Sequence, residues 1–163
     1  MDAPTAECFW VEPGRLLAGR HPGAHGDPAA ATATVEAIVR AGATLFLDLT
    51  EEGELAAYAH LLAGRARHLR RPIVDMWVCG GDELAETLDA IDDELARGGV
   101  VYVHCWGGCG RTGTVVSAWW VRHGTAPLEA LERYRRAAGA FTSRRCPETP
   151  EQEALVLGWG AGA

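Results

Sequence analysis

The hydrophobic pattern predicts a strand, a glycine-rich turn and a helix in the second half of the chain. The β-branched run over residues 100–103 is typical of a buried strand, and the apolar and aromatic run over 114–123 predicts a helix. Glycines at 107, 108 and 110 lie between them. This order aims backbone N–H groups and the positive end of a helix at one point, which suits an anion.

Three further helices are predicted around this unit. Asp82 opens a helix whose apolar positions repeat at intervals of three and four residues, and Gly98-Gly99 ends it. Pro127 suits the first turn of another helix. A capping box with proline at its second position, over residues 149–152, starts a last helix to about Leu157. The side chains expected to face inward are Leu84, Leu88, Ile91, Leu95, Leu128, Leu131 and Tyr134. The tail over 158–163 is expected to fray.

The first half of the chain predicts smaller elements. Short apolar runs at 8–11 and 15–18 flank Pro13-Gly14, which suits a type II turn and predicts an edge hairpin. Residues 19–31 are predicted to be loop. The remaining expected elements are a helix from Thr32 or Thr34 to near Gly42, a strand over 44–49, a helix over 54–62 and a partly polar strand over 67–74 nearer an edge.

Strands that alternate with helices predict an α/β fold. We expect a central, mostly parallel sheet of four to five strands flanked by helices, with the hairpin at one side. The chain of 163 residues shows no repeat, linker or low-complexity segment, so a single domain over 1–163 is expected.

Composition and charge narrow the possible partners. A hydrophobic content of 48% and a charged content of 23% are ordinary for a globular protein, and no run reaches the length of a membrane span. The net charge of −7 argues against nucleic acid or a membrane as partner. Residues 1–7 do not have the pattern of a secretory signal. Five cysteines without framework spacing favour a cytoplasmic, reducing setting, and we expect a monomer.

Two reactive side chains bracket the glycine turn: Cys105 at its start and Arg111 six positions later. The glycines let the loop curl until its amides point at one centre. The planar fork of Arg111 matches two oxygens of a phosphate. The same amides and helix end favour the thiolate of Cys105 over the thiol. The pattern therefore predicts a nucleophile beneath a bound phosphoryl group.

The loop sequence HCWGGCGRTG, residues 104–113, resembles the HCxxGxxR[ST]G signature of the cysteine-dependent protein-tyrosine and dual-specificity phosphatases. Residues 71–76 resemble the family segment that carries a general acid, and residues 146–152 resemble a C-terminal segment of small bacterial members. The resemblance covers most of the chain from about Thr44 onward. It implies a compact dual-specificity-phosphatase-like domain that hydrolyses phosphate monoesters, phosphotyrosine and also phosphoserine or phosphothreonine in proteins, or small phosphate monoesters.

The resemblance also implies roles for single residues. The Cys105 thiolate attacks phosphorus, and water hydrolyses the resulting phosphocysteine while Arg111 holds the equatorial oxygens. Asp75 protonates the leaving group, and Thr112 donates its hydroxyl to the Cys105 sulfur. His104 orders the loop, and Gln152 helps to position water. The residues implied to bind phosphate are Trp106, Gly107, Gly108, Cys109, Gly110 and Arg111. No metal and no cofactor are implied.

Some residues keep two interpretations. Asp82 is a second candidate for the acid, although it suits the cap of its helix. The proline that often follows the acid as Asp-x-x-Val-Pro is absent, since the chain reads DMWVC over 75–79. This places Cys79 near the mouth, and either Cys79 or Cys109 is a candidate for a protective disulfide with Cys105.

Other charged and aromatic residues are equally open. Glu51, Glu52 and Glu54 follow a strand end. They repel acidic substrates, orient Arg111 or form a solvated charge run. Arg144 and Arg145 either contact a second phosphate or an acidic flank of the substrate, or form a solvated pair. Trp77 and Trp106 are expected to line the pocket, whereas Trp119 and Trp120 are expected in the core. The histidines at 21, 25, 60, 68 and 123 carry no signature.

Competing functions are disfavoured by spacing. Cys-x3-Cys does not match the usual zinc sites, and rhodanese-like sulfur transfer typically uses a shorter cysteine loop. Phosphoinositide or inositol-phosphate hydrolysis predicts basic residues in the loop, and positions 106–110 supply none. A catalytically silent phosphate-binding module does not need Cys105 and Asp75 together with Arg111.

Overall fold

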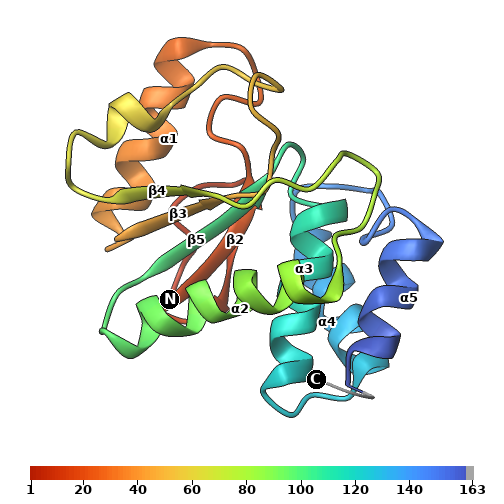
Figure 1. The fold of residues 1–163 in the computed structure, drawn as a ribbon. Helices are drawn as coiled ribbons and strands as arrows, with labels where there is room; N and C mark the ends of the chain where they lie inside the picture. The colour runs from red at the N-terminus through yellow and green to blue at the C-terminus, as the bar shows by residue number, and fades with distance from the viewer. Residues whose placement is uncertain (161–163) are drawn as a thin grey trace.

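The computed structural model describes residues 1–160, which form a sheet in the strand order β1-β2-β5-β3-β4 (Figure 1). The hairpin of β1 (Cys8–Glu12) and β2 (Leu16–Arg20) is antiparallel. The other pairs are parallel, so β5 (Val101–Cys105) lies between β2 and β3 (Leu45–Asp48), and β4 (Arg67–Arg70) forms the far edge. The predicted mostly parallel sheet with an edge hairpin is confirmed.

Helices cover both faces of the sheet. One face carries α1 (Pro28–Arg40) and the short 3₁₀ helix η1 (Ala59–Leu62). The other carries α2 (Gly81–Ala96), α3 (Gly110–Arg122), α4 (Pro127–Ala138) and α5 (Pro150–Trp159) (Figure 1). Because successive strand residues point to opposite faces, Val101 and Val103 pack toward α3 while Tyr102 packs toward α1. The central strand is therefore buried along its whole length.

Several helix boundaries differ from the sequence-based expectations. The predicted helix over 54–62 is wrong except for η1, which ends where Ala63 adopts the left-handed conformation. Helix α1 begins at Pro28 rather than at Thr32, because the Asp27 carboxylate accepts a hydrogen bond from the Ala29 N–H. Helix α3 begins at 110 instead of 114, so Arg111 lies in its first turn.

Smaller corrections concern the remaining helices. The N-cap of α2 is Gly80, whose N–H donates to the Glu83 carboxylate, so Asp82 lies in the first turn rather than at the cap. Leu128 is exposed at the start of α4 instead of facing inward. Helix α5 continues to Trp159, and residues 161–163 of the predicted frayed tail lie outside the described residues. None of the described helices is long and apolar enough to span a membrane.

Candidate active site

Two outer hydrogen bonds curl the loop between β5 and α3. The backbone N–H of His21 donates to the Trp106 carbonyl (3.0 Å), and the Tyr134 hydroxyl donates to the Gly108 carbonyl (2.8 Å). A trans peptide holds its C=O and N–H on opposite sides. With these carbonyls held outward, the N–H groups of the next residues point toward the centre of the loop. The hairpin and α4 thus orient the amide donors that the sequence predicted.

Gly108 packs directly on the backbone of β2. Its φ of +64° is in the left-handed region, and an added Cβ would lie 2.6 Å from the carbonyl oxygen of Gly19. At Gly107 an added Cβ would meet nothing within 4 Å. Of these two adjacent glycines, only the second is required by the shape of the loop.

Cys105 ends β5 beneath this loop and lines a cavity of about 320 Å³. The residue is 3% exposed, so the sulfur is reached through the cavity rather than from open surface. The other side chains that line the cavity are Arg20, Asp75, Met76, Trp106, Arg111, Arg144 and Glu148. A buried sulfur that opens on an anion-sized cavity is what nucleophilic attack on a phosphate requires.

Arg111 is held by acceptors from two segments, one after β3 and one after β4. Its Nη1 donates to Glu54 Oε2 (2.8 Å), the Ile73 carbonyl (3.0 Å) and the Leu49 carbonyl (3.4 Å), and its Nη2 donates to Glu54 Oε1 (2.6 Å). Asp75 Oδ1 lies 3.0 Å from the same Nη2. The guanidinium is only 2% exposed, so its fork has one fixed orientation.

Charge around Arg111 maintains its ionisation. Burial lowers the pKa of Arg111, but the Glu54 hydrogen bonds, the Cys105 sulfur and the Asp75 carboxylate together raise it above its ordinary value. Burial raises the pKa of Glu54, and the Arg111 hydrogen bond outweighs this and lowers it. Of the three glutamates after β3, Glu54 is the one that orients Arg111. The side chains of Glu51 and Glu52 are exposed to solvent.

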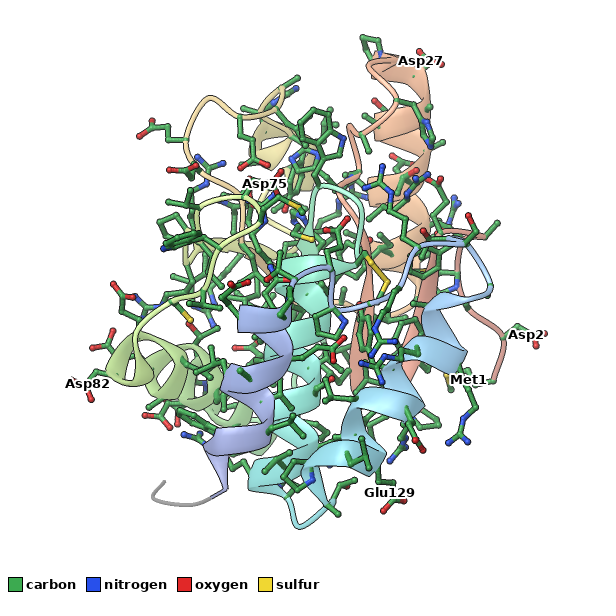
Figure 2. All side chains as sticks on the ribbon, turned by 90° about the vertical axis from the view of Figure 1, so that its right-hand side faces the viewer. Met1, Asp2, Asp27, Asp75, Asp82 and Glu129 are labelled. Atoms are coloured by element: carbon green, nitrogen blue, oxygen red, sulfur yellow. A yellow bond between two sulfur atoms is a disulfide. The ribbon has the colours of Figure 1, made fainter. Side chains whose placement is uncertain are left out.

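Asp75 and Asp82 lie in different places (Figure 2). Asp75 is carried by the loop between β4 and α2, lines the cavity and contacts Arg111. Asp82 lies at the outer end of α2, away from Asp75 (Figure 2). Met76, next to Asp75, adopts a left-handed φ of +62°, which turns the loop back at this point. Geometry therefore favours Asp75 over Asp82 as the proton donor.

Thr112 is completely buried in the first turn of α3. Within the described residues its Oγ1 has no hydrogen-bond partner, so the expected contact with the Cys105 sulfur is not formed. A buried hydroxyl without a partner is costly, which makes it a ready donor to a charge that develops beside it.

His104 is enclosed by a polar network beneath the loop. Its Nδ1 faces two acceptors, the Cys105 carbonyl (3.4 Å) and Asp48 (3.9 Å), so Nδ1 carries the proton and Nε2 accepts from the Tyr58 hydroxyl (2.5 Å). Burial lowers the pKa of His104 to about 3, although Asp48 acts to raise it. A neutral His104 fixes the peptide that carries the nucleophile.

Asp48 anchors this network from the end of β3. Its carboxylate is fully buried and accepts hydrogen bonds from Thr50 (2.6 Å to Oγ1), His68 (3.0 Å) and Arg70 (3.1 Å). Burial raises the pKa of Asp48, but the hydrogen bond from His68, the nearby His104 and the hydrogen bonds from Thr50 lower it well below its ordinary value. The Asp48 carboxylate is therefore ionised, and its hydrogen bonds offset the cost of burying its charge.

Gln152 connects the acid loop to α5. Its Oε1 accepts from the backbone N–H groups of Glu148 (2.9 Å) and Thr149 (3.2 Å), and its Nε2 donates to the Trp77 carbonyl (3.1 Å). Gln152 is fully buried and therefore caps the helix and holds the loop of Asp75 at the same time.

The cysteines correct one expectation. Cys109, a candidate partner for Cys105, is instead in a disulfide with Cys146. This bond connects the loop after β5 to the segment before α5. Cys79 is free and half-buried, and burial raises the pKa of its thiol.

The remaining candidates separate into those at the site and those away from it. Arg144 lines the cavity, whereas Arg145 pairs with Glu153 (2.8 Å). Trp106 lines the cavity as expected, and Trp77 is exposed beside the acid loop without lining it. The core placement of Trp119 and Trp120 is confirmed.

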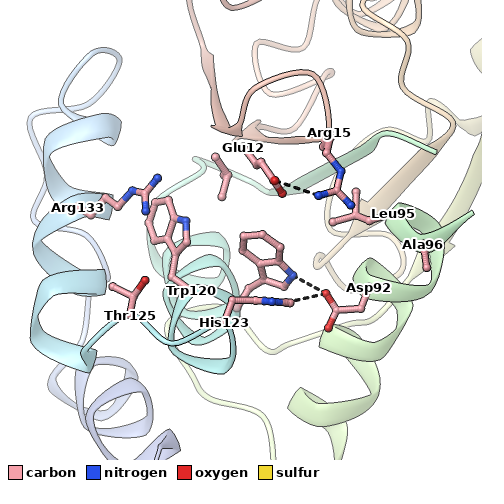
Figure 3. Close-up of a pocket in the computed structure, with 11 residues that line it drawn as sticks. Glu12, Arg15, Asp92, Leu95, Ala96, Trp120, His123, Thr125 and Arg133 are labelled. Atoms are coloured by element: carbon pink, nitrogen blue, oxygen red, sulfur yellow. Dashed lines mark hydrogen bonds and ion pairs between the residues drawn. The ribbon is translucent and has the colours of Figure 1, made fainter. Parts of the chain in front are cut away.

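A larger cavity, of about 600 Å³, lies at the other end of α3 (Figure 3). Its polar side chains pair with one another: Asp92 accepts from the Trp119 indole (2.8 Å) and contacts His123 (2.9 Å), and Arg15 pairs with Glu12 (2.9 Å). It contains no cysteine and no glycine loop, so the chemistry lies in the smaller cavity.

Sequence reasoning missed five residues of the site: Arg20, Asp48, Tyr58, Tyr134 and Glu148. Asp48 and Arg20 stand at the carboxyl ends of β3 and β2, where parallel strands place functional groups. Their position at the strand ends was the sequence signal that could have identified these two residues. Tyr58, Tyr134 and Glu148 carry no local pattern that distinguishes them from core or surface residues.

Comparison with known proteins supports the same chemistry. A family model described as the DSP-PTPase phosphatase domain of Swiss Army Knife proteins, PTP-SAK, matches residues 5–153. The crystal structure of Tk-PTP in the active form is similar with a TM-score of 0.80 and 26% identity over 96% of this chain and 98% of that chain. PTPMT1 in complex with PI(5)P shares the fold, with a TM-score of 0.72 and 20% identity over 94% of each chain.

Human DUSP28 also shares the fold, in its Y102H form, with a TM-score of 0.71 and 22% identity over 95% of this chain and 94% of that chain. The family model extends from before β1 into α5 and so contains every residue of the cavity. The chain therefore belongs to the dual-specificity and protein-tyrosine phosphatase family, as a phosphatase domain of the Swiss Army Knife type.

Proposed function

We propose that this chain hydrolyses phosphate monoesters of proteins, phosphotyrosine and also phosphoserine or phosphothreonine, through a cysteinyl-phosphate intermediate. The observation that carries the proposal is the placement of Cys105 at the base of a cavity that also holds the fixed guanidinium of Arg111. Inward amides of the loop and the start of α3 supply the remaining positive field.

In the first step the Cys105 thiolate attacks phosphorus. The S–P bond forms as the P–O bond to the leaving group breaks, and Asp75 gives its proton to the departing oxygen. A bound phosphate competes with Asp75 for Nη2 of Arg111, which lies 3.0 Å from the carboxylate. Displacing Asp75 from the guanidinium would leave its carboxyl free to face the leaving group.

In the second step water attacks the phosphocysteine and inorganic phosphate leaves. A carboxylate must accept a proton from that water, and Asp75, deprotonated by the first step, is the residue that the family resemblance implies. The unpartnered hydroxyl of Thr112 supports a role as donor to the sulfur as its negative charge returns. His104 and Gln152 act by holding the nucleophile and the acid loop.

Two substitutions test this proposal. Cys105→Ser should abolish turnover of p-nitrophenyl phosphate while phosphate or vanadate still binds. Asp75→Asn should reduce kcat about 100-fold on an alkyl phosphate, whose leaving group needs the proton, and far less on a good aryl leaving group. An equal loss on both substrates would contradict proton donation by Asp75, and turnover by Cys105→Ser would contradict the covalent mechanism.

A second candidate is the hydrolysis of phosphoinositides or inositol phosphates. The observation in its favour is that Arg20 and Arg144 line the cavity and could meet a second phosphate. Each of them is already paired, Arg20 with Glu7 (2.6 Å) and Arg144 with Glu148 (3.0 Å), which ranks this function lower. A panel of phosphopeptides, inositol phosphates and phosphoinositide vesicles separates the two candidates by kcat/KM.

The setting of the reaction belongs to the same proposal. We infer a monomeric single domain that acts in the cytoplasm, where Cys105 stays a free thiol. Cell fractionation followed by immunoblotting tests the location, and mass mapping of alkylated cysteines from freshly lysed cells should show Cys105 reduced. Sedimentation at several concentrations tests the monomer.

A further inference from the structure

Large apolar side chains are exposed at the entrance of the catalytic cavity. Within residues 1–160, seven large apolar side chains are exposed, and four of them belong to two short segments at this cavity. These four residues, which we call the apolar rim, are Val74, Met76, Trp77 and Trp106. The other three lie apart from one another, at residue 1, at the start of α4 and on α5. The clustering at the cavity indicates a surface that is covered when the enzyme works.

The loop that carries three residues of the apolar rim is held in one conformation. At its start the Ile73 carbonyl accepts a hydrogen bond from Arg111 (3.0 Å). A turn follows, in which the Trp77 N–H donates to the Val74 carbonyl (3.0 Å), and the Trp77 carbonyl accepts from Gln152 Nε2 (3.1 Å). Because the backbone is fixed on both sides of the turn, its side chains are presented to solvent at a defined place.

Met76 occupies a backbone conformation that favours glycine. Its φ is +62°, and within residues 1–160 Ala63 is the one other residue besides glycine with a positive φ. A side chain at positive φ is strained, so glycine would suit this turn better. The chain has instead a large apolar side chain that is exposed and lines the cavity. Strain that is kept beside a reaction site points to a use for the side chain there.

The apolar rim is continuous with the catalytic cavity, so the substrate is the molecule placed to cover it. Met76 and Trp106 line the cavity, and Val74 and Trp77 extend the apolar surface from the same turn as Met76. A phosphorylated side chain that reaches Cys105 brings its neighbours in sequence against this surface. In an extended segment, residues two positions apart point to the same side. The residue two positions from the phosphorylated one therefore faces the apolar rim.

Charge favours a protein segment over a lipid surface as the occupant. The chain has a net charge of −7, and Asp75 is the one charged residue in the segment 74–79. The exposed carboxylates of Asp82 and Glu83 follow at the start of α2. Anionic headgroups would be repelled by these charges, whereas a neutral apolar side chain of a peptide is not.

We propose that the apolar rim selects phosphoprotein segments that carry a large apolar residue, above all an aromatic one, two positions before or after the phosphorylated residue. This inference rests on the proposed function and names its substrate class. Trp77 acts here as a specificity residue and takes no part in breaking bonds. Removing one large apolar side chain from water against the rim should favour such a segment by about tenfold or more.

Paired phosphotyrosine peptides test this selection. The members of each pair are identical except for tryptophan or serine two positions after the phosphotyrosine in one pair, and two positions before it in the other. In at least one pair, the wild type should have a kcat/KM about tenfold or more higher for the tryptophan peptide. Trp77→Ser should reduce this ratio below about threefold, and Trp77→Phe should keep it above about fivefold.

Two controls isolate the apolar rim from the chemistry and from general surface polarity. p-Nitrophenyl phosphate has no neighbouring residue, so its kcat/KM should change less than about twofold in Trp77→Ser. Leu128→Ser removes another exposed apolar side chain and should keep the full peptide ratio. Leu128 is next to Glu129, which lies at the other end of the molecule from Asp75 (Figure 2).

Equal kcat/KM values for both members of both pairs would overturn the inference, and so would a tenfold ratio that survives in Trp77→Ser. Co-sedimentation with phosphatidylcholine vesicles that depends on Trp77 would assign the rim to a lipid surface, and a dimer that dissociates in Trp77→Ser would assign it to a second copy. Either result overturns the inference. A wild type that hydrolyses p-nitrophenyl phosphate without distinguishing the peptides refutes the inference alone. A wild type that hydrolyses none of these substrates refutes the proposed function itself.

Discussion

Glu54 binds both terminal nitrogens of Arg111, with Oε2 at 2.8 Å from Nη1 and Oε1 at 2.6 Å from Nη2. Glu54 is in an irregular segment after β3, yet its side chain is only 13% exposed because it is covered against the arginine. A bidentate pair fixes the plane of the guanidinium as well as its position. The guanidinium that we propose to bind phosphate is therefore oriented before any substrate arrives.

Glu54→Gln should hold the Arg111 guanidinium less firmly, while a side chain of nearly the same size still fills the site of Glu54. We expect kcat/KM for an aryl phosphate to fall about 10-fold to 100-fold, because the fork loses one charge-assisted bond and part of its alignment. The exposed neighbour Glu52→Gln is the matched control and should retain wild-type rates. Unchanged kinetics in Glu54→Gln, measured with a folded protein by circular dichroism, would contradict the orienting role.

The adjacent glycines of the loop should respond oppositely to alanine. Gly108→Ala places a Cβ at positive φ and 2.6 Å from the Gly19 carbonyl, so the loop must shift and turnover should fall at least 100-fold. Gly107→Ala meets nothing within 4 Å and should stay within about threefold of the wild type. Steady-state kinetics on the two variants, side by side, checks this. Similar activities would show that the loop does not depend on its contact with β2.

The Cys109–Cys146 disulfide should stabilise the loop and the whole fold. It closes a segment with a sequence separation of 37, for which the lost entropy of the unfolded chain corresponds to about 2–4 kcal/mol. Cys146→Ser should lower the free energy of urea unfolding by that amount under non-reducing conditions. Cys79→Ser, at a free cysteine, should not. If dithiothreitol leaves the wild-type midpoint unchanged, the bond contributes no stability.

Acid should destabilise the fold through the buried histidines. Burial lowers the pKa of His104 from 6.5 to about 3 and that of His21 to about 4. Between pH 6.5 and 4.5 the unfolded chain therefore binds protons that the folded chain does not, and stability falls as the pH falls. The slope should be about 1.4 kcal/mol per pH unit for each histidine.

Urea unfolding at pH 7, 6 and 5 checks this slope. His104→Gln should flatten it by one proton, whereas the exposed His60→Gln should leave it unchanged. A wild-type free energy of unfolding that is constant from pH 7 to 5 would contradict the neutral, buried state of these histidines.

The parts of the fold that sequence predicted correctly are those governed by local rules. The type II turn at Pro13-Gly14 forms with Gly14 at φ +74°, and the capping box of α5 forms with Thr149 and Gln152 bonded as expected. The apolar, β-branched run of β5 and the helical spacing along α2 were also sufficient. The loop of Cys105 was predicted because its glycines and its arginine lie within one short segment.

The failures share a long-range cause. Glu54 was predicted to lie on a helix because its segment is rich in alanine and leucine, but its carboxylate pairs with Arg111, 57 residues away in sequence. Cys109 was considered with Cys105, four residues away, and bonds instead to Cys146 across 37. Tyr58 and Asp48 acquire their roles only when three strands bring them beneath His104. Local sequence propensity carries no information about partners that lie this far away along the chain.

The contacts of Gly108 with Gly19 and of Gln152 with Trp77 have a biosynthetic consequence. The cavity draws on both the second strand and the segment that leads into α5. A nascent chain still lacking α5 therefore has Cys105 and Arg111 but not the Gln152 bond to the loop that carries Asp75. We expect the cavity to be complete only when residues from both ends of the described chain have docked.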